Sequence, residues 1–188
     1  MVINNSLLFG DQEYFAIEIK PQRAAKKFYL KFWFEGNVIG DFGKAGSLDY
    51  IINEYFRFLQ NKDSLYDEKF RTMTDMEIYK DIVLVLFTNL PEGMEDKLYD
   101  RMNRYAYTFG DYQFTNFSFL LLSLREERKV KVLVYEMDGE NEPKLHSYKI
   151  DSNQFLSVYK QFLRYAYEHD LKKKKPFFPE RFSYKDIE

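Results

Sequence analysis

The stretch that decides the fold is Lys27-Phe-Tyr-Leu-Lys-Phe-Trp-Phe-Glu35, within a longer organising segment from Phe15 to Gln60. Its apolar residues recur at every second position, which predicts a β-strand with one face turned to a core. The predicted core face holds Phe28, Leu30, Phe32 and Phe34. Trp33 falls on the opposite face, and so large an indole there requires a cover of some kind.

The neighbouring segments extend this strand into a meander. A strand precedes it and stops at Pro21, and a tight turn at Gly36-Asn37 returns the chain in a short third strand. Ser47 is a good N-cap for the helix that follows. One continuous apolar stripe runs along that helix: Leu48, Ile51, Ile52, Tyr55, Phe56 and Leu59. Because a lone hairpin is marginal, we expect the helix to pack on the meander.

The remaining chain repeats strands and helices without a matching internal repeat. Asn61 to Arg71 is expected to be a loop, Thr74 and Glu77 form a capping box, and Asp151 or Ser152 caps the last helix. The prediction is an α+β fold of antiparallel β-meanders packed with α-helices. Strands are expected near 14–20, 27–35, 38–42, 116–125, 130–137 and 144–150, and helices near 47–60, 75–88, 94–105 and 152–168. Residues 1–171 are expected to form one domain, and 172–188 a basic C-terminal tail that can pack back onto it.

Composition excludes several classes of function. The chain has 188 residues and a net charge of −2, too balanced for a protein that coats nucleic acid. It contains no cysteine, which excludes thiol catalysis and disulfides. The N-terminus lacks a signal-peptide pattern, and no apolar run approaches the roughly 20 residues that span a bilayer. We therefore expect a soluble cytoplasmic protein, with ring packing from its 19 Phe and 16 Tyr in the core.

Catalytic and ligand-binding motifs are weak throughout. The two histidines, His146 and His169, are isolated in sequence and suggest neither a triad nor a His-rich metal site. The glycine-rich corner from Gly40 to Ser47 fails as a phosphate loop, because Val38 and Ala45 stand where the motif requires Gly and Ser or Thr. What remains there is a generic weak anion site at a helix start. We expect no catalytic residue, no metal and no cofactor, and hence not an enzyme.

Sequence similarity points in one direction. The pattern Leu8-Phe9-Gly10-Asp11-x-x-x-Phe15-Ala16-Ile17-Glu18 precedes the aromatic strand, and Gly36-x-x-Ile39-Gly40-Asp41 and Ser47-Leu48 follow it. A Phe-rich strand at 117–122, the run 129–133 and a terminal helix with Phe155 and Phe162 complete the pattern. Over roughly residues 8–165 the chain resembles the immunity proteins of bacterial polymorphic toxin and contact-dependent growth inhibition systems, most of all immunity protein family 42.

This resemblance implies a cytosolic antidote that binds the C-terminal domain of one cognate toxin, often a nuclease, and occludes it. A monomer before toxin binding is expected, with no membrane and no direct nucleic acid as partner. Residues 61–112 hold seven basic and eleven acidic residues, and this acidic balance would suit a basic nuclease. The predicted contacts are acidic residues with tyrosine anchors in that segment and the acids of a later hairpin tip: Asp63, Tyr66, Asp67, Glu68, Glu92, Glu95, Asp96, Tyr99, Asp138, Glu140 and Glu142.

Two other classes of function stay open at this level. One is a small enzyme or small-molecule-binding domain with a pocket lined by tyrosines and Trp33, which would require a buried cavity with a converging carboxylate. The other is a nucleic-acid accessory protein that uses the lysines at 172–175.

Overall fold

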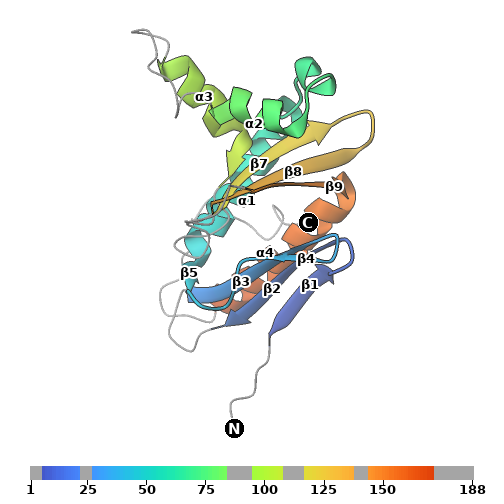
Figure 1. The fold of residues 1–188 in the computed structure, drawn as a ribbon. Coiled ribbons are helices and arrows are strands. Elements are labelled where there is room, and N and C mark those ends of the chain that lie inside the picture. The colour runs from blue at the N-terminus through green and yellow to red at the C-terminus, as the bar shows by residue number, and fades with distance from the viewer. Residues whose placement is uncertain (1–5, 22–26, 84–94, 108–116, 138–143, 172–188) are drawn as a thin grey trace.

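The computed structural model describes residues 6–21, 27–83, 95–107, 117–137 and 144–171. Two antiparallel sheets lie one above the other, and helices pack between them and on one outer side (Figure 1). This arrangement confirms the predicted α+β class.

The N-terminal sheet contains five strands: β1 (Leu7–Asp11), β2 (Phe15–Pro21), β3 (Lys27–Phe34), β4 (Asn37–Ile39) and β5 (Gly46–Ser47). Its order is β1-β2-β3-β4, with β5 also paired to β3. The predicted strands near 14–20 and 27–35 are confirmed, and the third is shorter than expected. Strands β1 and β5 are absent from the sequence prediction, because runs of five and two residues carry little periodicity.

The C-terminal sheet contains β6 (Ala106–Tyr107), β7 (Phe117–Leu124), β8 (Lys129–Glu136) and β9 (Lys144–Asp151), in that order. The three long strands lie where the sequence predicts them. The two-residue strand β6 was not predicted, since it directly continues the preceding helix.

Four α-helices and two 3₁₀ turns complete the described chain. The helices are α1 (Leu48–Asn61), α2 (Asp75–Val83), α3 (Glu95–Tyr105) and α4 (Ser152–Leu171). The expected loop at 61–71 instead contains two 3₁₀ turns, η1 (Lys62–Ser64) and η2 (Glu68–Arg71). The expected C-terminal tail at 172–188 lies outside the described residues.

Helix caps follow the local sequence. The Thr74 hydroxyl accepts from the Glu77 backbone N–H at 3.3 Å, and Glu77 Oε2 accepts from the Thr74 backbone N–H at 2.7 Å, so the capping box is confirmed. The Thr74 backbone N–H lowers the pKa of the Glu77 carboxyl. For α4 the cap is Asp151, whose Oδ1 accepts from the backbone N–H of Asn153 and Gln154.

The core lies between the two sheets and is built from stacked rings. The four residues predicted on the core face of β3 are at most 4% exposed. Phe34 stacks on Tyr148 of β9 with ring centroids 5.0 Å apart, and Phe15 stacks on Phe155 of α4 at 4.8 Å. Helix α4 thus covers the inner face of the N-terminal sheet, while α2 and α3 lie on the far side of the C-terminal sheet (Figure 1).

The predicted turn at Gly36-Asn37 is wrong by one residue. Phe34 pairs with Asn37, and the two turn residues are Glu35 (φ 49°) and Gly36 (φ 79°). Positive φ at both positions is typical of the tight turn whose twist matches the strands of a hairpin. Asn37 stabilises the turn from outside it, because its side-chain amide donates to the carbonyls of Phe34 and Glu35.

The tip of this hairpin joins the two sheets. The Glu35 N–H donates to the Tyr14 carbonyl at 2.8 Å, and the Gly36 N–H donates to the Gln12 carbonyl at 2.9 Å. The Glu35 carboxylate in turn accepts from the backbone N–H of Lys149 on the edge strand β9 at 3.0 Å. Within the described residues, no helix has the length and apolar character needed to cross a bilayer.

Candidate partner-binding surfaces

The connector between α1 and α2 holds four of the predicted contact residues: Asp63, Tyr66, Asp67 and Glu68. Leu65 is buried, and its carbonyl accepts from the Ser123 N–H at 3.0 Å, which fixes the connector against β7. Between the connector and the β7–β8 turn lies an open cleft of about 290 Å³. Its lining includes Tyr66, Arg71, Arg125, Glu126, Lys131 and Lys149.

Charges around this cleft are already paired within the chain. Arg71 Nη1 lies 2.9 Å from a Glu68 oxygen and 3.0 Å from a Glu126 oxygen. The Tyr66 hydroxyl donates to Glu68, and the Arg125 guanidinium lies over the Tyr66 ring, 4.8 Å from its centroid. The Tyr66 hydrogen bond, followed by that from Arg71, lowers the pKa of the Glu68 carboxyl. A cationic partner would therefore have to compete with Arg71 for Glu68.

Asp67 belongs to a second network that joins η2, α2 and α3. Its carboxylate accepts from the Lys69 backbone N–H at 3.2 Å and lies 3.6 Å from the Arg101 guanidinium. Arg101 also pairs with Asp81, which Lys69 Nζ approaches to 2.7 Å. The structure thus brings Asp67 close to α3, and its carboxylate helps to hold these elements together.

Helix α3 presents two of the predicted contacts, Asp96 and Tyr99, to solvent. Tyr105 on its inner side is buried, whereas Asp96 and Asp100 are exposed and the Tyr99 ring is 44% exposed. Positions 96, 99 and 100 share one face of a helix. Among the described residues, neither Asp96 nor Asp100 has an ion-pair partner. This face therefore offers carboxylates beside an aromatic ring to a partner.

The predicted contact residues that the structure describes are spread over the connector and α3. Asp63 is exposed in η1, near Tyr66, while Asp96 and Tyr99 lie on α3. Glu95 begins α3, but its side chain lies outside what the structure describes. Four further predicted residues also lie outside the described chain: Glu92, Asp138, Glu140 and Glu142. The contact set as a whole remains a prediction.

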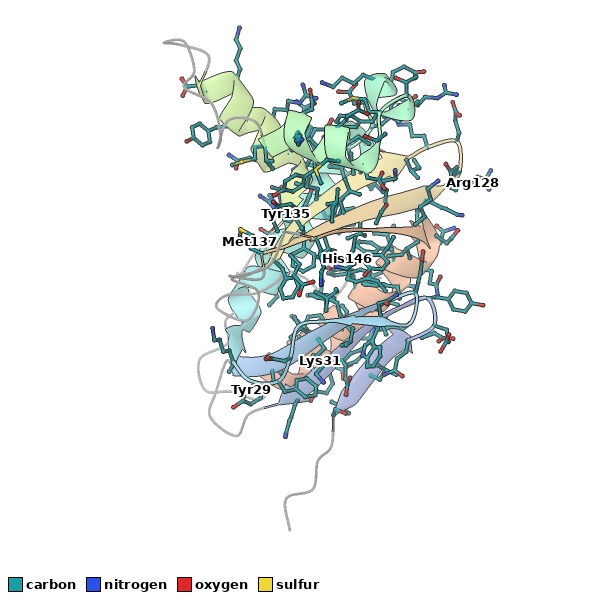
Figure 2. All side chains as sticks on the ribbon, viewed as in Figure 1. Tyr29, Lys31, Arg128, Tyr135, Met137 and His146 are labelled. Carbon is teal, nitrogen blue, oxygen red and sulfur yellow. The ribbon has the colours of Figure 1, made fainter. Side chains whose placement is uncertain are left out.

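The outer face of the N-terminal sheet was not among the predicted toxin contacts, although the sequence places Trp33 on it. The indole Nε1 of Trp33 donates to Glu18 Oε2 on the neighbouring strand at 3.0 Å. Lys31 Nζ lies 4.2 Å from the centroid of the Phe42 ring, which also contacts Tyr29 edge-on at 6.5 Å. Figure 2 shows Tyr29 and Lys31 on this sheet. Residues at every second position of β3 share one face of the sheet, and this alternation in the sequence places Tyr29, Lys31 and Trp33 together.

A polar cluster in the interior serves the fold. The Arg57 guanidinium lies 4.3 Å from the centroid of the Tyr107 ring, donates to the Ala106 carbonyl and pairs with Glu54 at 2.5 Å. Burial raises the pKa of Tyr107 to about 12 and that of Tyr159 well above its usual value. Both phenols therefore keep their protons at neutral pH, while Arg57 links α1 to β6.

The candidate chemical groups of the sequence are not assembled into a reactive site in the described chain. His146, near the start of β9 (Figure 2), has its Nε2 3.3 Å from Glu136 Oε2 at the end of β8, and both side chains are partly exposed. In the glycine-rich corner, Asp41 Oδ1 accepts from the Gly43 N–H at 2.7 Å. No three His, Asp or Glu side chains of the described residues gather as metal ligands would.

Comparison with known proteins identifies the class. Residues 1–165 match the protein-family model described as Immunity protein 42, so the chain belongs to this family. It is a toxin-neutralising immunity protein, as the resemblance predicted. A search of curated proteins finds no match. The solved structure of CdiI from Burkholderia dolosa AUO158 has a similar fold: TM-score 0.54 and 11% identity, over 85% of this chain and 99% of that one.

Proposed function

We propose that the protein acts by stoichiometric binding to the C-terminal domain of one cognate toxin, a nuclease, and covers the active site or a surface that the toxin needs. The observation that carries this proposal is the family match over residues 1–165, which includes both sheets and most of α4. The protein itself performs no chemistry in this scheme.

The described surface fits a binding role. Its ionisable side chains form ion pairs around an open cleft, as with Arg71, Glu68 and Glu126, and do not converge in an enclosed cavity. The described rings of the core stack on one another, as Phe15 does on Phe34 and Phe155, and Phe34 on Tyr148. The protein is proposed to be a cytoplasmic monomer that meets the toxin there.

The acidic residues of the predicted contact set would attract the toxin domain electrostatically. Asp96 on α3 and Asp63 on the connector would steer a basic toxin domain toward the protein, with Tyr99 and Tyr66 as anchors beside them. Rim charges of this kind change the association rate and its salt dependence more than the final affinity. Glu92, Glu95 and the hairpin acids Asp138, Glu140 and Glu142 are proposed as further contributors.

The test is binding to a defined probe, the C-terminal domain encoded immediately upstream, carrying a substitution that inactivates it. We expect a 1:1 complex in titration calorimetry and rescue of growth when the active domain is co-expressed. The C-terminal domain of an unrelated toxin is the specificity control. If no toxin C-terminus encoded nearby binds, the proposal is wrong.

A charge reversal tests the steering. Asp96→Lys should slow association several-fold at low salt, and the difference should shrink as the ionic strength rises. Glu168→Lys makes the same charge change at an exposed position of α4 and serves as the matched control. Equal association rates for the two variants would remove α3 from the contact set.

A further inference from the structure

The outer faces of the two sheets differ in what covers them. On the C-terminal sheet, Tyr79 of α2 stacks on Tyr135 at 4.4 Å, and Asp75 of α2 pairs with Lys131 at 2.6 Å. The inner face of the N-terminal sheet is covered by α4. No described helix lies on the outer face of the N-terminal sheet, at the end of the molecule opposite α2 and α3 (Figure 1). The segment with Phe42 approaches this face near Tyr29 and Lys31.

Strand register defines the residues of this open face. Trp33 lies between Ala16 on β2 and Val38 on β4, and Leu8 on β1 lies opposite Glu18. The side chains of Leu8 and Val38 are each 46% exposed, although both are aliphatic. We call the following set the Trp33 face: Leu8, Glu18, Tyr29, Lys31, Trp33 and Val38.

The central side chains of this face are held in place before any partner arrives. The Trp33 N–H is bonded to Glu18, and Lys31 is held over the ring of Phe42. A surface that is already ordered loses little side-chain entropy on binding. Tryptophan and tyrosine are also the residues most enriched among those that dominate interface energies.

We infer that the Trp33 face is the surface on which the toxin domain docks, with an apolar projection of the toxin packed between Trp33, Val38 and Leu8. This inference rests on the proposed function and names the binding surface for it. It is an alternative to the acidic contact set proposed above, because it places the main contact on the opposite end of the molecule from the acidic residues of α3.

The size of the face argues for a hetero-complex. The residues of β1, β2, β3 and β4, spaced about 3.4 Å along a strand and about 4.8 Å between strands, give a face of roughly 400 Å². A standard complex buries about 800 Å² per partner, and the β1–β2 turn, where Tyr14 is 59% exposed, extends the face toward that value. Obligate homodimers bury larger and more apolar surfaces, whereas Glu18 and Lys31 occupy the middle of this one.

The charges on the Trp33 face also indicate the chemistry of the toxin surface that would fit it. Glu18 and Lys31 are direct cross-strand neighbours, so neither sign dominates the centre of the face. The matching toxin surface would be apolar at its centre, with hydrogen-bonding groups of both signs around it. This differs from the uniformly basic partner that the acidic residues of α3 would select.

The experiment uses the same inactivated C-terminal domain encoded upstream as the probe. Val38→Lys and Leu8→Lys place a charge on exposed positions of the Trp33 face, and each should weaken binding about 30-fold or more. Met76→Lys is the matched control, because Met76 is 38% exposed on α2 at the other end of the molecule. Trp33→Ala should also weaken binding, and urea unfolding of each variant separates lost contact from lost fold.

The outcomes separate the two proposals. If the wild type binds and both face variants bind as tightly as Met76→Lys, the Trp33 face is not the docking surface, while the proposed function stands. If the wild type is a dimer that Val38→Lys converts to a monomer, a second copy covers the face and the inference is wrong. If the wild type does not bind, the proposed function fails and this inference fails with it.

Discussion

Replacing Gly10 by alanine should destabilise the protein more than the same replacement at Gly36, although both glycines have positive φ. Gly10 has φ 96° and Gly36 has φ 79°, conformations that residues with a Cβ adopt at a cost of about 1–2 kcal/mol. The surroundings differ. A Cβ on Gly10 would lie 2.4 Å from the Phe15 carbonyl oxygen and 2.6 Å from Val158 Cγ2, whereas at Gly36 the nearest atom is a Glu13 carboxylate oxygen at 4.0 Å.

The magnitude follows from these distances. Gly36→Ala should cost only the backbone term, about 1–2 kcal/mol. Gly10→Ala adds an overpacking term of about 1–3 kcal/mol, because the Phe15 carbonyl belongs to the strand backbone and Val158 is part of the buried face of α4. The expected total is about 2–5 kcal/mol, with β1 displaced from α4.

Urea unfolding followed by far-UV circular dichroism measures both variants against the wild type. The difference between the two free energies of unfolding isolates the packing of α4 on β1. Equal losses for the two variants would refute the close approach of α4 to Gly10. A loss below about 1 kcal/mol for Gly36→Ala would refute the backbone cost assigned to the hairpin turn.

Three further substitutions test the core, an ion pair and a cap. Phe155→Ala should lower the free energy of unfolding by about 3–5 kcal/mol, since the ring is 1% exposed; a loss under 1 kcal/mol would contradict the stacked core. Burial works to raise the pKa of Asp75, but hydrogen bonds led by that from Lys131 lower it overall. Asp75→Asn should therefore lower the free energy of unfolding by about 1 kcal/mol near pH 6. This loss should shrink as the pH falls through the lowered pKa of Asp75, which lies below the usual 3.8. A loss that does not change with pH would contradict the role of this carboxylate. Thr74→Ala should cost about 1 kcal/mol in urea unfolding, and Thr74→Ser should restore most of it.

Some of the structure could be predicted because its signals are local. The alternation in β3 predicts its core face, and the Thr74 and Glu77 capping box predicts where α2 begins. In both cases the residues that interact are neighbours in sequence, so the period of the pattern is enough. The resemblance to immunity protein family 42 could also be recognised from the sequence alone.

The hairpin turn shows where local pattern stops being sufficient. Glu35-Gly36 and Gly36-Asn37 are both acceptable turns by composition, and the choice depends on Phe34 pairing with Asn37. The short strands β1, β5 and β6 likewise exist only because a longer strand lies beside them. Register and strand pairing are properties of two segments together.

The candidate surfaces depend on tertiary structure even more strongly. The acidic residues of 61–112 look alike in sequence, yet Asp67 lies near Arg101 from 34 positions away and Asp96 has no described partner. The strand alternation put Trp33 opposite the core, but only the packing of the helices decided which sheet face stays open. Neighbouring residues set local conformation, whereas exposure and charge pairing depend on which distant residues the fold brings into contact.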